Sequence, residues 1–218
     1  MTHQEFGQAV LAVLLELWGR GVQEGTERGD AIIQEFLGLP ETQPYPRKAY
    51  CGLTQQAAWR KVGLERNLAS VGKVLFGFGY GNRLRPGGGG GKAFAEYDDP
   101  MPQLGWSGRR LVTRDMRLAL PGDLILHQDD KNPYQGHVMA CLQGHRNDRI
   151  MTIEGNGTGT LCLPGFPRGE GIIMRSWNLL QPQPKKYLTW VVRPAPEDLA
   201  DLPALVEEAP IDGDVARH

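Results

Sequence analysis

The part of the sequence that decides the fold is residues 121–156, which read PGDLILHQDDKNPYQGHVMACLQGHRNDRIMTIEGN. Short apolar runs within it are separated by polar segments that favour turns, among them Asn147-Asp148. This pattern predicts antiparallel β-strands, and a run near the end of the chain has the same character. The predicted strands cover residues 123–127, 137–143, 149–154 and 187–193, with turns at 129–135 and 155–159.

The N-terminal part of the sequence has helical periodicity instead. Apolar side chains recur at helical spacing over residues 5–18 and predict an amphipathic helix that packs on a core. A second helix is expected over residues 30–37, with Asp30 as its N-cap. A proline-rich segment then keeps the chain extended up to Cys51, where a third helix begins and runs to Gly63. Helices followed by a mostly antiparallel sheet predict an α+β fold, with the N-terminal helices packed on the sheet.

The bulk composition fits a globular protein without a basic surface. Of the 218 residues, 40% are hydrophobic and 22% are charged, and the formal net charge is −1, so we expect no nucleic-acid partner. The apolar run Ala9–Trp18 is too short to span a membrane and contains Glu16. No positive charge precedes it and no small-residue cleavage site follows it, so neither a signal peptide nor a membrane partner is expected.

The length suits one domain with a tail. We expect a single domain over residues 1–194 and an acidic tail over residues 195–218. The tail is predicted to be flexible and solvated, because acidic termini usually are. The alternative is one amphipathic turn that contains Leu199, Leu202 and Leu205.

A long insert near residues 75–109 interrupts this domain and is rich in glycine. Its Gly-Gly-Lys sequence at residues 90–92 resembles a phosphate-binding loop only superficially. Pro86 stands where that motif needs its first glycine, and Ala93 stands where it needs Ser or Thr. The insert is therefore expected to be a flexible loop on the rim of the protein.

The chain has three cysteines, Cys51, Cys141 and Cys162, and Cys51 is the candidate nucleophile. Their odd number and irregular spacing predict neither a disulfide framework nor a zinc site. Cys51 lies where an extended segment meets a helix. Unpaired backbone N–H groups at a helix N-terminus favour negative charge, so they lower a thiol pKa and can stabilise an oxyanion.

A cysteine nucleophile needs a base, and His137 is the candidate because it opens a predicted strand in Gly136-His137-Val138. Glu154 and Asn156 end the next strand and alternate onto one face, so either could orient the imidazole. His145 is an alternative base, but its surroundings indicate a solvated turn. A metal site formed by Asp123, His127, Asp129 and Asp130 is disfavoured, because their spacing matches no metal motif.

Taken in order, these segments resemble the CHAP domain of the wider NlpC/P60 group. The resemblance covers roughly residues 20–193. It includes an upstream Gly-Asp-x-Ile-x-x-x-Phe segment at residues 29–36. Its core motifs are Tyr50-Cys51, Pro121-Gly122-Asp123-Leu124-Ile125, Gly136-His137-Val138 and Ile153-Glu154-Gly155-Asn156.

The resemblance implies a papain-like fold and an enzyme that cleaves peptidoglycan, as an N-acetylmuramoyl-L-alanine amidase or a peptide endopeptidase. By position, Cys51 matches the nucleophile, His137 the base, and Glu154 and Asn156 the orienting residues. The residues after the cysteine and after the histidine depart from the family pattern, which leaves the substrate details open. Residues 41–50 lack the spaced aspartates of calcium-binding members, so no calcium and no cofactor is expected.

The resemblance also bears on location and partners. An enzyme of this kind, made in the cytoplasm without a signal peptide, would reach the cell wall by phage lysis, a dedicated secretion machine or a virion particle. The expected partner is the peptidoglycan peptide, and a secreted toxin would also need a cognate inhibitor. The alternative is a non-catalytic module on the same fold that binds peptide or cell wall without cutting it.

Overall fold

The computed structural model describes residues 1–38, 50–65, 95–101, 106–129, 136–157, 171–180 and 187–203. Of these, residues 95–101, 106–112, 128–129, 156–157 and 187–188 are described by their backbone. Cys162, most of the glycine-rich insert and most of the predicted turn at 129–135 lie outside the described residues.

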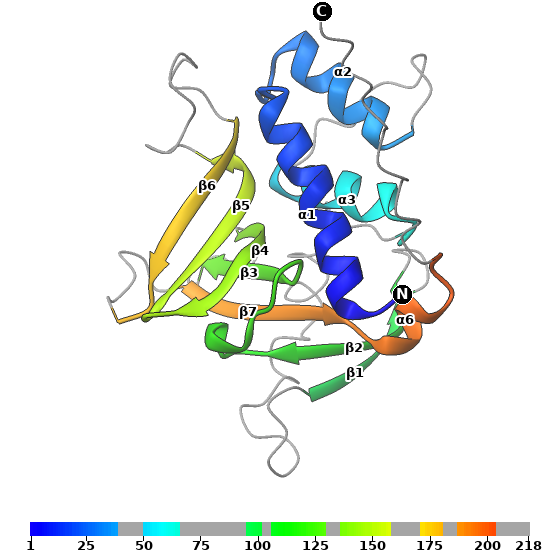
Figure 1. The fold of residues 1–218 in the computed structure, drawn as a ribbon, viewed down its shortest axis with the longest axis vertical. Helices are drawn as coiled ribbons and strands as arrows, with labels where there is room; N and C mark the ends of the chain where they lie inside the picture. Colours follow the sequence, from blue (N-terminus) through cyan, green and yellow to red (C-terminus); the bar gives the residue numbers. More distant parts are fainter. Residues whose placement is uncertain are drawn as a thin grey trace, which may run out of the picture.

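The described strands form one seven-stranded sheet with the order β1-β2-β7-β3-β4-β5-β6, in which every neighbouring pair is antiparallel. Together with the helices, this confirms the predicted α+β class. Figure 1 shows the helices gathered against a sheet that turns from β6 on the left to β1 at the bottom. The strands are β1 (Ala95–Met101), β2 (Trp106–Thr113), β3 (Leu124–Asp129), β4 (Gly136–Arg146), β5 (Arg149–Gly157), β6 (Gly171–Asn178) and β7 (Tyr187–Pro194).

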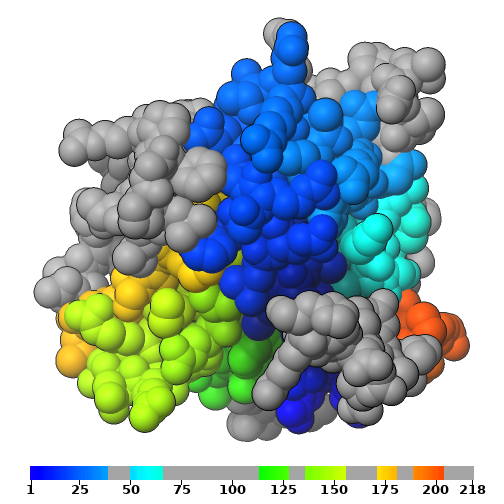
Figure 2. All heavy atoms as spheres, turned by 45° about the horizontal axis from the view of Figure 1, so that its top comes forward, coloured from blue at the N-terminus to red at the C-terminus, as the bar shows by residue number. Residues whose placement is uncertain are grey.

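The helices are α1 (His3–Gly19), α2 (Glu27–Phe36), α3 (Tyr50–Lys61) and α6 (Pro196–Ala200), with a short 3-10 turn, η3 (Met116–Leu118). A capping box between Thr2 and Glu5 starts α1. Asp30 is not the N-cap of α2: Thr26 accepts the hydrogen bond from the Gly29 N–H, and α2 begins one turn earlier than predicted. In the space-filling view, α1 has strands β4 and β5 on one side and α3 on the other (Figure 2).

Both faces of the central strands are buried. On β3, Leu124 and Leu126 join the larger core cluster with the helices, while Ile125 joins a smaller cluster on the other face. Val138 and Met139 divide in the same way on β4. Strands covered on both faces have continuous apolar runs rather than strict alternation, as residues 121–156 do.

Three observed strands were not predicted. β1 lies within the expected glycine-rich loop near residues 75–109, β2 begins within it, and β6 lies beyond it. β1 contains two aspartates and Pro100, which weaken a strand signal, and it stands at the edge of the sheet, where proline is tolerated. The predicted turn at 155–159 begins too early, because β5 continues to Gly157 through an irregular register with β6.

The predicted tail boundary at residue 195 is also too early. Residues 196–200 form α6, and Leu199 is buried in the larger core cluster, with Leu202 packed against it. The Met1 ammonium group donates a hydrogen bond to the Leu199 carbonyl at 3.2 Å. Burial of these leucines offsets the ordering of an otherwise acidic segment, so the body extends at least to Leu202.

Candidate active site

Cys51 is the second residue of α3, and its side chain is buried with 5% of its surface exposed. This end of α3 lies against β5 at Gly155. A Cβ there would be 2.3 Å from Thr54 Oγ1 and 3.1 Å from the Tyr50 carbonyl oxygen, so only glycine allows the contact. Gln55 Nε2 adds a hydrogen bond of 3.2 Å to the Ile153 carbonyl. The glycine after Glu154 therefore sets the distance between the cysteine helix and β5.

His137 lies between Cys51 and Glu154. It is the second residue of β4, and the pairing of Ala140 with Ile153 places Glu154 diagonally across from it on β5. His137 Nε2 is hydrogen-bonded to Glu154 Oε2, and the imidazole also forms a hydrogen bond with Cys51. The structure thus brings together three of the four predicted site residues.

The electrostatics of this group favour a charged pair. Burial raises the pKa of Cys51, but the hydrogen bond to His137, its positive charge, and the backbone amides of Val138 and Gly52 bring the pKa below its ordinary value. Burial lowers the pKa of His137, and the interactions with Cys51 and Glu154 raise it by more, to about 9. Each shift favours the thiolate beside the imidazolium, which is the reactive form of a cysteine nucleophile.

Glu154 is fully buried and has a second partner that the sequence analysis did not identify. Arg175 Nε lies 3.0 Å from Glu154 Oε1, so the carboxylate is bonded to His137 through one oxygen and paired with Arg175 through the other. Arg175 is on β6, directly opposite Thr152 of β5. Its signal in the sequence is the apolar run Ile172-Ile173-Met174 that precedes it, which would have predicted this strand.

His127 also lies near the site, paired with His137 across β3 and β4. Its ring contacts Trp177 edge-on, with a centroid distance of 4.9 Å. Burial and the positive charge of His137 lower the pKa of His127 to about 4, so this imidazole is neutral near pH 7. His137, and not His127, is the histidine that can hold a proton beside Cys51.

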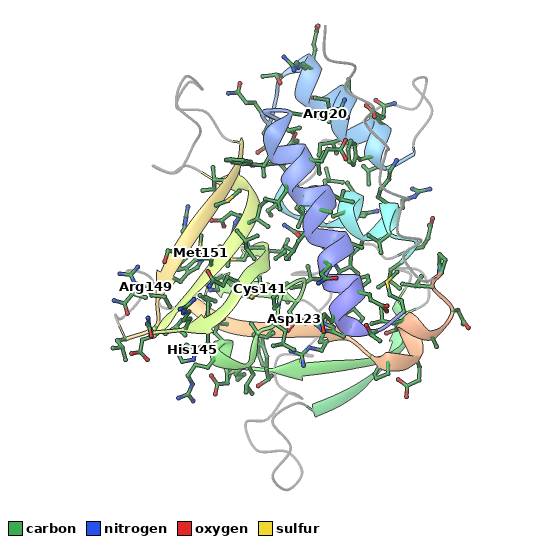
Figure 3. The ribbon with its side chains drawn as sticks, viewed as in Figure 1. Arg20, Asp123, Cys141, His145, Arg149 and Met151 are labelled. Atoms are coloured by element: carbon green, nitrogen blue, oxygen red, sulfur yellow. The ribbon has the colours of Figure 1, made fainter. Side chains whose placement is uncertain are left out.

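The remaining candidates lie elsewhere. His145 is at the end of β4 and lies 3.6 Å from Asp148, and Figure 3 shows it at the lower left end of the strands, away from α3. The adjoining turn at Asn147-Asp148 is confirmed, since both residues have positive φ. Cys141 is a core residue of β4, where burial and the charge of Asp123 raise its pKa to about 12.

Asn156 is on β5, two residues beyond Glu154, and its side chain lies outside the described residues. The carboxylate of Asp123 is paired with Arg193 and His3 rather than with His127. Within the described ranges, no group of three or more His, Cys, Asp and Glu side chains is placed to hold a metal ion.

Comparison of the chain with models of protein families, with curated proteins and with solved structures found no match in any of the three. Among the helices that the structure describes, none is both long enough and apolar enough to cross a membrane.

Proposed function

We propose that the protein is a cysteine hydrolase that cleaves an amide bond in peptidoglycan, with Cys51 as nucleophile and His137 as general base and acid. The observation that carries the proposal is the buried hydrogen-bonded series Cys51–His137–Glu154, which begins at a helix N-terminus. A nucleophile, a base and a carboxylate that orients the base form the arrangement shared by triad hydrolases on unrelated folds.

Each step of the proposed reaction has a residue or backbone group to perform it. The Cys51 thiolate attacks the amide carbonyl carbon, and backbone amides at the start of α3 stabilise the resulting oxyanion. His137 donates its proton to the leaving amine, which leaves an acyl group on the sulfur. His137 then takes a proton from water, whose oxygen attacks the thioester and releases the acid product.

The substrate and the finer fold rest on the resemblance to the CHAP and NlpC/P60 group. A cysteine at a helix N-terminus packed on antiparallel strands that carry histidine and glutamate is the arrangement expected of a papain-like fold. Proteins with this ordered motif set mostly cleave peptidoglycan, as amidases or peptide endopeptidases. The peptide part of peptidoglycan is therefore the proposed partner, reached by phage lysis, a virion particle or dedicated secretion.

The test is digestion of purified sacculi from several cell-wall types, followed by assays for new amino groups and new reducing ends. Amide cleavage predicts new amines without new reducing ends. Cys51→Ala is the inactive control, and Cys141→Ser is the matched cysteine variant that retains activity. Binding to sacculi without amine release would favour a non-catalytic module, and new reducing ends would indicate a glycosidase.

A further inference from the structure

Arg175 occupies a defined position behind the candidate triad. It projects from β6 on the same face as Glu154, because it is directly opposite Thr152 and therefore one diagonal step from Glu154. Its Nε lies 3.0 Å from Glu154 Oε1, while Oε2 of the same carboxylate is bonded to His137. The guanidinium and the imidazole therefore hold the two oxygens of one fully buried carboxylate.

Trp177 provides a surface on which the guanidinium stacks. The Arg175 Cζ lies 5.1 Å from the centre of the Trp177 ring, within the range of a cation–π interaction. The indole is itself fixed, because its Nε1 donates a hydrogen bond of 2.9 Å to the buried Thr152 hydroxyl and its ring contacts His127. This support limits the positions available to the Arg175 side chain.

Among the residues that the structure describes around Cys51, the charges balance when Arg175 is included. In the reactive form, Cys51 and Glu154 are each negative, and His137 and Arg175 are each positive, so they sum to zero. The groups that face one another are Cys51 from α3, His127 from β3, His137 from β4, Glu154 from β5 and Arg175 from β6. His127 is neutral near pH 7 and cannot supply the fourth charge.

We infer that Arg175 is a positioning residue that holds the Glu154 carboxylate in place against His137, and so maintains the thiolate of Cys51 in the buried site. The inference rests on the proposed Cys51–His137 chemistry and extends it by one residue. Without the guanidinium, the reactive form would carry a net charge of −1 in a buried environment. The site would relieve this charge by returning a proton to the thiolate.

The test is the rate of Cys51 alkylation by iodoacetamide between pH 4 and pH 9, followed by peptide mass spectrometry. No cell-wall substrate is needed. We expect Arg175→Met to move the midpoint of the pH profile upward by about one unit, or roughly tenfold in rate on the acidic side. Arg175→Lys keeps the charge and should retain most of the wild-type profile, and Arg175→Gln serves as the uncharged variant if Arg175→Met does not fold.

Two further comparisons test whether Arg175 acts through Glu154 or only stabilises the fold. In a Glu154→Gln background, Arg175→Met should produce a much smaller shift, because the residue through which it acts has lost its charge. Arg193→Met removes the corresponding arginine beside Asp123 and should lower the melting temperature without moving the alkylation profile.

The outcomes distinguish this inference from the proposed function. A wild-type Cys51 profile that stays reactive at low pH and is unchanged in Arg175→Met would overturn the role of Arg175 alone. A wild-type profile like that of free cysteine would overturn both the role of Arg175 and the proposed nucleophile. Equal shifts in Arg175→Lys and Arg175→Met would also contradict the inference, since charge would then not be what matters.

Discussion

Asp123 and Glu154 are both fully buried carboxylates, and each is paired with one histidine and one arginine. Asp123 accepts hydrogen bonds from Arg193, from the Leu120 N–H and from His3 at the start of α1, so it ties that helix to β3 and β7. Glu154 is bonded to His137, which in turn bonds to Cys51. Figure 3 shows Asp123 beside the N-terminal end of α1.

A carboxylate, an imidazole and a guanidinium therefore have different effects in the two groups, according to what the histidine contacts next. At Asp123 the histidine belongs to a packed helix, and the group stabilises the fold. At Glu154 the histidine faces a thiol at a helix N-terminus, and the group changes the ionisation of that thiol. Variants of the Asp123 cluster (Asp123, His3 and Arg193) and of the Glu154 cluster (Glu154, His137 and Arg175) can therefore serve as controls for each other.

The largest expected effect separates the two cysteines near these clusters. Cys51→Ser should lower amine release from sacculi at least about a thousandfold, because a hydroxyl is far less ionised than a thiol. Cys141→Ser, next to the Asp123 cluster, should lower stability by about 1 to 2 kcal/mol and retain substantial activity. An essential Cys141 with a dispensable Cys51 would show that the site is misassigned.

The second-largest effect is expected from substitution of the two carboxylates, which should affect different properties of the protein. Glu154→Gln should lower turnover by about a hundredfold, because the imidazolium loses the charge that stabilises it. Asn156→Ala should lower turnover less. Asp123→Asn should instead lower the free energy of unfolding by about 3 kcal/mol, because it leaves Arg193 without its buried counter-charge. Thermal melts and amine release on the same samples would test this, and a reversed pattern would contradict it.

The pH dependence of hydrolysis follows from the same pair of shifts. The reactive form needs a deprotonated Cys51 and a protonated His137, so turnover should rise as pH passes the lowered pKa of Cys51. It should fall as pH passes about 9, the raised pKa of His137. Glu154→Gln should move the alkaline side of this profile down toward the ordinary imidazole value, while Asp123→Asn should leave it in place. An alkaline side unmoved in Glu154→Gln would exclude Glu154 as the partner of His137 in turnover.

A smaller effect is expected at the glycine beside each cluster. A Cβ on Gly7 would lie 2.2 Å from the Pro121 carbonyl oxygen, and one on Gly155 would lie 2.3 Å from Thr54 Oγ1. Gly7→Ala and Gly155→Ala should each lower stability by about 1 to 3 kcal/mol through overpacking. Only Gly155→Ala, which displaces the start of α3, should also slow Cys51 alkylation. Equal alkylation rates in the two variants would show that the packing of α3 on β5 does not affect the reactivity of the Cys51 thiol.

Local patterns predicted most of the central structure. The apolar runs around β3, β4, β5 and β7 and the turn at Asn147-Asp148 are signals carried by neighbouring residues, as is the periodicity of α1. The order of Cys51, His137 and Glu154 also predicted which side chains come together, because adjacent antiparallel strands place histidine and glutamate within reach.

Edge strands and contacts between residues far apart in the sequence could not be predicted from such local patterns. β1 and β6 lie at the two ends of the sheet, and β1 carries polar residues and proline that weaken its signal. Arg175 reaches Glu154 only because β6 pairs with β5 in a particular register. Leu199 is buried through its contact with the opposite end of the chain, so its acidic neighbours misled the prediction of a solvated tail from residue 195.

The activation of Cys51 is tested most directly by alkylation of the native protein with limiting iodoacetamide at pH 6.5, with Cys51 and Cys141 quantified by peptide mass spectrometry. We expect Cys51 to react roughly tenfold or more faster than free cysteine at this pH, because His137 and the start of α3 favour its thiolate. Cys141 is expected to stay unmodified, since burial holds it as the thiol. A Cys51 rate equal to that of free cysteine, or preferential modification of Cys141, would contradict the proposed activation of Cys51.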